Sequence, residues 1–120
     1  MSIETMNAKI RSTQLGTEDH GIFTCFLHLE YDHAGQGFGG YALDEHNKKR
    51  GVESARVGTA YGLQFLMEIL RVLEVGSWEK LPGTVCRVCA EHSKVHAIGH
   101  FLKDQWFDPA ELLAQERANV

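Results

Sequence analysis

Alternating apolar and polar residues at 22–31, IFTCFLHLEY, predict the best-defined β-strand of the chain. Along this run the odd-numbered residues from Phe23 to Leu29 share one face, which we expect to meet the core. Residues 8–15, AKIRSTQL, predict a second strand, and the intervening GTEDHG has the composition of a turn. The two strands are therefore expected to form an antiparallel hairpin.

The hydrophobic pattern changes to helical spacing at residues 59–75, TAYGLQFLMEILRVLEV. Thr59 can cap the start of this segment and Gly76 can end it, so we predict the main amphipathic helix at about 59–75. Its wide apolar stripe is expected to cover a sheet or a second subunit. A short C-terminal helix is predicted after Asp108 and Pro109, a capping residue followed by a residue suited to the first helical turn.

The segment between these helices has one clear strand and one ambiguous stretch. Residues 84–91, TVCRVCAE, are rich in β-branched residues and predict a strand. Residues 90–103 fit either a helix or a strand, but Gly99 disfavours a helix by about 1 kcal/mol relative to alanine. We therefore expect a turn at EHSK and a strand from Val95 onward. The order of elements predicts an α+β fold, an antiparallel sheet with helices on one face, in a single domain over residues 1–120.

The stretch CRVCAEHSKVHAIGH, residues 86–100, contains two cysteines and three histidines at spacings typical of zinc ligands. However, Cys86 and Cys89 are three positions apart in a predicted strand, so their side chains should point to opposite faces. They cannot share a metal ion without a bulge or a turn. The stretch also lacks the His-Glu-x-x-His arrangement of a metalloprotease helix. We predict no metal site and no resident cofactor.

Four glycines fall within residues 35–40, GQGFGG. The run contains no Gly-Lys-Ser/Thr and does not open into a helix, so it is neither a P-loop nor a dinucleotide-binding fingerprint. It is either a bulged or flexible hairpin end or a backbone cradle for a ligand. The polar residues 44–58 that follow are expected to form an exposed loop. No serine has the context of a nucleophile elbow and no carboxylate pair is fixed beside a histidine, so we predict no catalytic residues.

Composition narrows the possible partners. The 120 residues carry 12 Lys and Arg against 16 Asp and Glu, a net charge of −4, so direct nucleic-acid binding is not expected. Charged residues interrupt the longest apolar run, and the N-terminus lacks the apolar core of a signal peptide. Three cysteines without a secretory signal indicate reduced thiols and a cytoplasmic protein.

Several side chains are suited to a nucleotide-derived ligand, because aromatic rings stack on bases while cationic and imidazole groups hold phosphate. The candidates are Phe38, Tyr41, Arg56, Tyr61, Arg87, His92, Lys94 and His96. The last four form a polar edge beyond the predicted 84–91 strand. If the protein has a ligand site, we expect it where this edge faces the GQGFGG segment.

The segments LGTEDHGIFTCFLHLEYD, GQGFGGYALDE, GTAYGLQFL, SWEKLPG and EHSKVHAIGHFLKDQWFDP resemble those of a group of small proteins encoded by phages and prophages. The resemblance covers roughly residues 6–109. It implies a cytosolic accessory protein made in an infected bacterium, and it supplies no catalytic residue.

Small phage accessory proteins without a catalytic site commonly act by binding, and many of them counter host antiviral defence. We therefore expect a non-enzymatic homo-oligomer that sequesters a cyclic-nucleotide or ADP-ribose-derived immune signal. One alternative is an anti-CRISPR-type inhibitor of a host defence protein, whose acidic surface would compete for a basic groove. A small metal-binding or enzymatic module is the remaining alternative.

Overall fold

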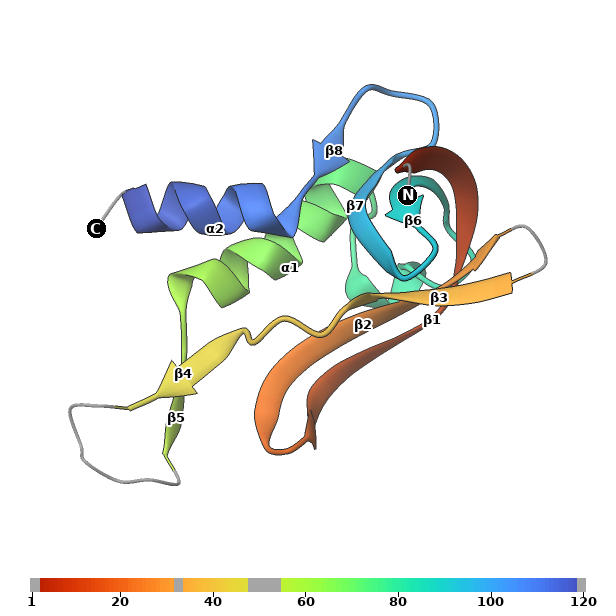
Figure 1. Cartoon of the computed structure of the whole chain (residues 1–120). Coiled ribbons are helices and arrows are strands. Elements are labelled where there is room, and N and C mark those ends of the chain that lie inside the picture. Colours follow the sequence, from red (N-terminus) through yellow and green to blue (C-terminus); the bar gives the residue numbers. More distant parts are fainter. Residues whose placement is uncertain (1–2, 32–33, 48–54, 119–120) are drawn as a thin grey trace.

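The computed structural model describes residues 3–31, 34–47 and 55–118, and it confirms the predicted α+β fold with its antiparallel sheet. The sheet has six strands, in the spatial order β3 (Ala34–Gly39), β2 (Ile22–Tyr31), β1 (Glu4–Asp19), β6 (Val85–Glu91), β7 (Lys94–His100) and β8 (Trp106–Phe107). A separate ribbon of β4 (Asp44–His46) and β5 (Arg56–Gly58) extends away from this sheet (Figure 1).

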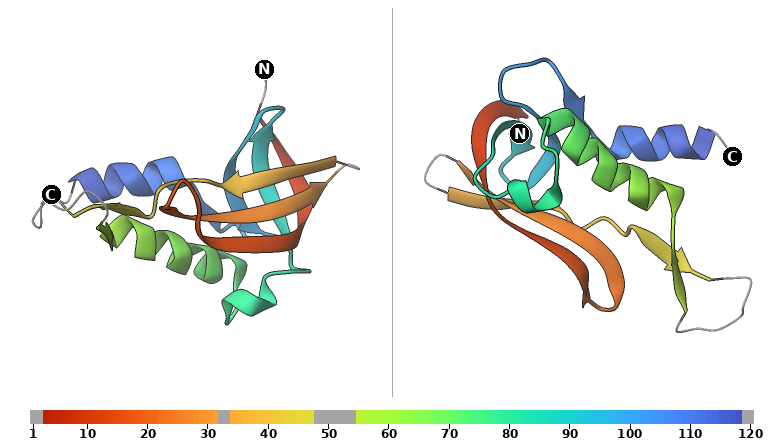
Figure 2. Two further views of the ribbon diagram at one scale, coloured as in Figure 1. Left: turned by 90° about the horizontal axis from the view of Figure 1, so that it is seen from below. Right: turned by 180° about the vertical axis from the view of Figure 1, so that it is seen from behind.

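The long strand β1 joins the two halves of the sheet. It pairs with β2 along one part of its length and with β6 along another, and Lys9 lies opposite both Glu30 and Val85. The sheet is strongly curled, so β3 and β7 approach within 8 Å between Cα atoms although they are not neighbours in the sheet (Figure 2). Arg11 has no partner on β2, because Ile10 and Ser12 pair on either side of it. Arg11 is thus the extra residue of a β-bulge, which increases the bend of the strand.

The two helices lie together on one side of the curled sheet (Figure 1). Helix α1 (Ala60–Leu73) begins as predicted, since the Thr59 hydroxyl accepts a hydrogen bond from the backbone N–H of Gly62 at 2.9 Å. Helix α2 (Pro109–Ala118) also begins as predicted, because the Asp108 carboxylate accepts from the N–H of Ala110 at 2.9 Å.

The predicted end of the main helix at Gly76 is wrong. The helix ends at Leu73, and Glu74 adopts the left-handed conformation with φ 56°. The Glu74 carboxylate accepts hydrogen bonds from Lys103 and Gln105, which hold this residue in a conformation that usually favours glycine. A short 3-10 turn, η1 (Trp78–Lys80), then leads into β6.

An aromatic cluster from three elements forms the centre of the core. The ring centroid of Phe65 on α1 lies 4.9 Å from that of Phe107 on β8 and 6.1 Å from that of Phe38 on β3. The expected apolar face of β2 is buried in the same core from Cys25 through Leu29, as predicted. The core therefore ties both helices to the inner face of the sheet.

Residues 94–100 form strand β7 after a turn, so the strand interpretation of this stretch is confirmed. By contrast, the expectation of a loop across 44–58 is wrong at its two ends, which pair as β4 and β5, while residues 48–54 lie outside the described part of the chain. Neither helix within the described residues combines the length and apolar content needed to cross a membrane.

Candidate functional site

A hollow of about 820 Å³ lies on the outer face of the sheet where β1, β2 and β3 meet. It combines a cationic, an anionic and an imidazole side chain with bare backbone, as small-molecule sites often do. The lining residues are Arg11, His28, Leu29, Glu30, Ala34, Gly35, Gln36 and Gly37.

Gly35 and Gly37 of the edge strand β3 form the floor of this hollow. Gly35, Gly37 and Gly39 alternate along the strand, so all three lie on its outer face. A Cβ atom on Gly39 would lie 2.0 Å from the carbonyl oxygen of Cys25, so no side chain fits there, and the φ of +133° also requires glycine. Of the two interpretations of the glycine run, the bulge does not hold for Ala34–Gly39, because β3 pairs with β2 in regular register. The glycines form a strip of backbone without side chains, part of which the Phe26 ring covers.

Two aromatic side chains of β2 lie beside this glycine strip. The rings of Phe26 and His28 are nearly parallel, at 17° with centroids 6.3 Å apart. A Cβ atom on Gly37 would meet the Phe26 ring at 3.5 Å, so this ring lies over the strip. The His28 side chain is exposed, and its ring forms no hydrogen bond with any residue in the described ranges. Its ring is therefore available to stack on a planar ligand.

Arg11 supplies the free positive charge of the hollow. It is exposed and makes neither a hydrogen bond nor an ion pair with any other described residue. Its position in the bulge of β1 leaves the side chain without a cross-strand partner. A free guanidinium can bind a phosphate or a carboxylate through two parallel hydrogen bonds.

Glu30 adds a directional hydrogen-bonding group. Its carboxylate is exposed on the outer face, opposite Gly35. Gln36 alternates with the glycines, so its side chain lies on the other face of β3, where its oxygen accepts a hydrogen bond from the Tyr31 hydroxyl. The hollow thus offers a cation, a ring and an acceptor.

Sequence reasoning missed Arg11, His28 and Glu30. A usable signal existed for His28 and Glu30, because strand alternation already placed them on the face away from the core. None existed for Arg11, because the bulge depends on how β1 pairs with β2 and has no signature in AKIRSTQL.

Two of the predicted ligand-binding rings serve the core instead. Phe38 is fully buried and packs against Phe65 and Phe107, so its ring is not presented to a ligand on the surface. Tyr61 donates its hydroxyl to the carbonyl oxygen of Pro109 at 3.3 Å and meets Phe65 edge to face. Burial raises the pKa of Tyr61 to about 12, so the hydroxyl stays protonated and links α1 to α2.

The two arginines predicted to bind a ligand, Arg56 and Arg87, form hydrogen bonds within the protein instead. Arg56 forms two hydrogen bonds with Asp44 at 2.7 and 2.9 Å across the β4–β5 ribbon, and these bonds lower the pKa of the Asp44 carboxyl. Arg87 donates to the carbonyl oxygens of His100 and Lys103 at 2.8 and 2.7 Å. Both guanidinium groups therefore stabilise local structure.

The remaining predicted residues form the polar edge near the start of β7. The Lys94 ammonium lies 5.7 Å from the centre of the Tyr41 ring, a cation–π contact that joins β7 to the segment after β3. His96 is hydrogen-bonded to Glu91 at 3.0 Å, which lowers the pKa of that carboxyl, and His92 is exposed in the turn between β6 and β7. The edge does reach the end of the glycine segment, but none of these residues lines the hollow.

The two cysteines of β6 point to opposite faces, as strand geometry predicts. Cys86 is fully buried, and burial raises the pKa of its thiol to about 12. Cys89 is partly exposed on the other face, next to Thr5. Across the described ranges, no three His, Cys, Asp or Glu side chains gather in a way that could hold a metal ion.

Comparisons of the chain with protein-family models, with curated proteins and with solved structures find no match. Any function must therefore be inferred from the structure itself. The hollow brings a guanidinium, an imidazole and a carboxylate together beside the backbone of β3.

Proposed function

We propose that the protein is a binding protein that sequesters a small nucleotide-derived ligand in the hollow formed by β1, β2 and β3. The observation that carries this proposal is the unpartnered Arg11 guanidinium at a glycine floor that also has the exposed His28 ring on its rim. The guanidinium would hold a phosphate, and the imidazole would stack on the base. The Glu30 carboxylate would accept hydrogen bonds from ribose hydroxyls.

The resemblance to small phage and prophage proteins supports a role for this binding in infection. In the cytoplasm of an infected bacterium, such a protein would lower the free concentration of a cyclic-nucleotide or ADP-ribose-derived immune signal. It would do so without chemistry on the ligand, since it would hold the signal intact. The net charge of −4 favours a small anionic ligand at one local cation over a long nucleic acid spread across the surface.

Replacing Arg11 with glutamine is expected to weaken this binding about 10- to 100-fold, because a hydrogen bond to a charged group contributes about 1.5–3 kcal/mol. Isothermal titration calorimetry with cyclic di-AMP, cyclic di-GMP, ADP-ribose and AMP measures the effect. The matched control is Arg117→Gln, since Arg117 is an exposed arginine on α2 that does not line the hollow. The ligand released on heating should have its original mass. Equal affinities for the two variants would place the ligand outside the hollow.

A second candidate function, a protein–protein interface, is favoured by an apolar stripe on α1. Leu63 and Met67 are 63% and 53% exposed, and the neighbouring Leu66 and Leu70 are only partly buried. Four apolar side chains at helical spacing on an exposed face are typical of an interaction surface. The stripe favours a homo-oligomer, and an inhibitor of a host defence protein would use the same surface.

The double substitution Leu63→Asp and Met67→Asp is expected to convert a homo-oligomer into monomers, because each protomer would bring two carboxylates into the apolar interface. Light scattering coupled to size-exclusion chromatography, run at several concentrations, measures the mass. Ala114→Asp adds a carboxylate on the exposed surface of α2 and is the matched control. A wild-type protein that is monomeric throughout would contradict the homo-oligomer.

A further inference from the structure

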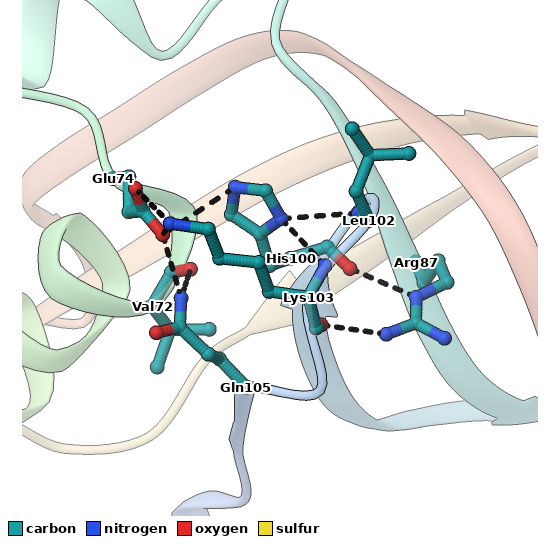
Figure 3. A network of polar contacts seen from close by, with 7 residues as sticks. All are labelled: Val72, Glu74, Arg87, His100, Leu102, Lys103 and Gln105. Carbon is teal, nitrogen blue, oxygen red and sulfur yellow. Dashed lines mark hydrogen bonds and ion pairs between the residues drawn. The ribbon is translucent and has the colours of Figure 1, made fainter.

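The loop between β7 and β8 folds around one imidazole ring. The Nδ1 atom of His100 accepts hydrogen bonds from the backbone N–H groups of Leu102 and Lys103, at 3.0 Å each (Figure 3). A ring nitrogen accepts a hydrogen bond only while it carries no proton. The observed shape of the loop therefore requires the neutral imidazole, with its proton on Nε2.

The charged groups around the ring agree with this tautomer. From the end of α1, the Glu74 carboxylate faces the Nε2 side of His100 at 3.7 Å. The same carboxylate oxygen is 2.7 Å from the Lys103 ammonium, so its charge is already paired. From β6, Arg87 donates to the His100 carbonyl oxygen, and Cys86 lies opposite His100 with a thiol that burial keeps neutral. The contacts drawn at Nδ1 are the two backbone N–H donors, whereas the Glu74 carboxylate lies on the Nε2 side of the ring (Figure 3).

We propose that His100 is a pH-sensitive latch that holds the β7–β8 loop closed when neutral and releases it when protonated. A proton on Nδ1 would point toward two N–H donors, which removes both hydrogen bonds and places like dipoles together. The closed loop therefore binds fewer protons than the open loop, so acid favours opening and alkali restores closure.

The released segment is expected to be short. The Gln105 side chain donates to the Val72 carbonyl oxygen at 3.2 Å and to Glu74 at 3.0 Å, and neither bond involves the imidazole. These contacts keep the end of the loop on α1 and leave β8 in place. The part that opens carries Leu102, whose side chain is 81% exposed. The latch would thus change how the protein presents an apolar side chain at a loop tip, independently of the ligand hollow.

Nuclear magnetic resonance of the whole protein tests the latch through the backbone dynamics of residues 101–104. In the wild type, the heteronuclear NOE values of the Leu102 and Lys103 amides should be high at about pH 7.5 and fall at about pH 5.5. In His100→Asn, the side-chain oxygen takes the place of Nδ1 and does not titrate, so both amides should stay ordered at both pH values. His92→Asn is the matched control, because His92 lies in an exposed turn, and it should keep the wild-type response.

Two results would overturn the latch: Leu102 and Lys103 amides that stay ordered in the wild type at about pH 5.5, or a His100→Asn variant that loses order as the wild type does. Should His100→Asn fail to fold, the ¹⁵N shifts of the wild-type ring decide the point. Nδ1 must show the shift of a nitrogen without a proton at about pH 7.5, and a protonated Nδ1 there would contradict the proposal.

Discussion

Replacing Phe65 with alanine is expected to lower the free energy of unfolding by about 3–5 kcal/mol, the usual cost of truncating a buried phenylalanine. The Phe65 side chain is fully buried, and its ring contacts those of Phe38, Phe107, Tyr41 and Tyr61. These rings come from α1, β3, β8 and the segments beside them. The cavity would therefore lie where the helices meet the sheet, where the main chain has little freedom to collapse.

Urea unfolding followed by circular dichroism measures this loss. The control is Leu15→Ala on β1, because Leu15 is 42% exposed and lies outside the aromatic cluster and the α1 stripe. That change is expected to alter the free energy of unfolding by less than about 0.5 kcal/mol. A loss of less than about 1 kcal/mol for Phe65→Ala would mean that the aromatic cluster is not the centre of the core.

The substitution Gly62→Ala separates helix propensity from packing by the sign of its effect. Propensity alone predicts a gain of about 1 kcal/mol, because Gly62 lies inside α1. The structure predicts a loss of at least about 2 kcal/mol, because overpacking forces the backbone to shift. A Cβ atom on Gly62 would lie 2.0 Å from the carbonyl oxygen of Leu43 and 2.7 Å from its carbonyl carbon. Both are main-chain atoms, so no side-chain rotation can relieve the clash.

The same unfolding experiment measures this change, with Gly58→Ala as the control. Gly58 lies just before α1, and a Cβ atom there would meet no atom within 4 Å. Its substitution should leave the free energy of unfolding within about 0.5 kcal/mol of the wild-type value. A Gly62→Ala protein more stable than the wild type would show that α1 is not in contact with the Leu43 backbone.

Local patterns were sufficient for the hairpin and for the start of each helix. Strand alternation from Cys25 to Leu29 and the capping side chains of Thr59 and Asp108 depend only on nearby residues, and the structure confirms them, although Phe23 is only partly buried. The end of α1 was missed because Glu74 is held in the left-handed conformation by Lys103 and Gln105, which are far away in the sequence. Local sequence patterns therefore could not predict the end of an element that depends on residues far away in the sequence.

The candidate site likewise depends on long-range contacts that residue type alone does not predict. Residue type alone made Phe38 and Arg56 candidates, but availability depends on what each side chain meets in the fold. Phe38 faces inward because of its register in β3, and Arg56 is paired with an aspartate twelve positions away. Among the residues that line the hollow, the free guanidinium is that of Arg11, which lies in a bulge of β1. The sequence shows that the glycines cluster, but only the pairing of β3 with β2 shows that they share the outer face of the sheet.

The measurement that tests the central claim most directly is a ¹H–¹⁵N correlation titration of the wild-type protein with cyclic di-AMP and with ADP-ribose. Ligand binding in the hollow predicts saturable shifts at the backbone amides of Arg11, His28, Gly35 and Gly37, with the amides of Lys94 and His96 unchanged. Absence of shifts with either ligand, or shifts confined to the Lys94–His96 edge, would contradict the proposed site.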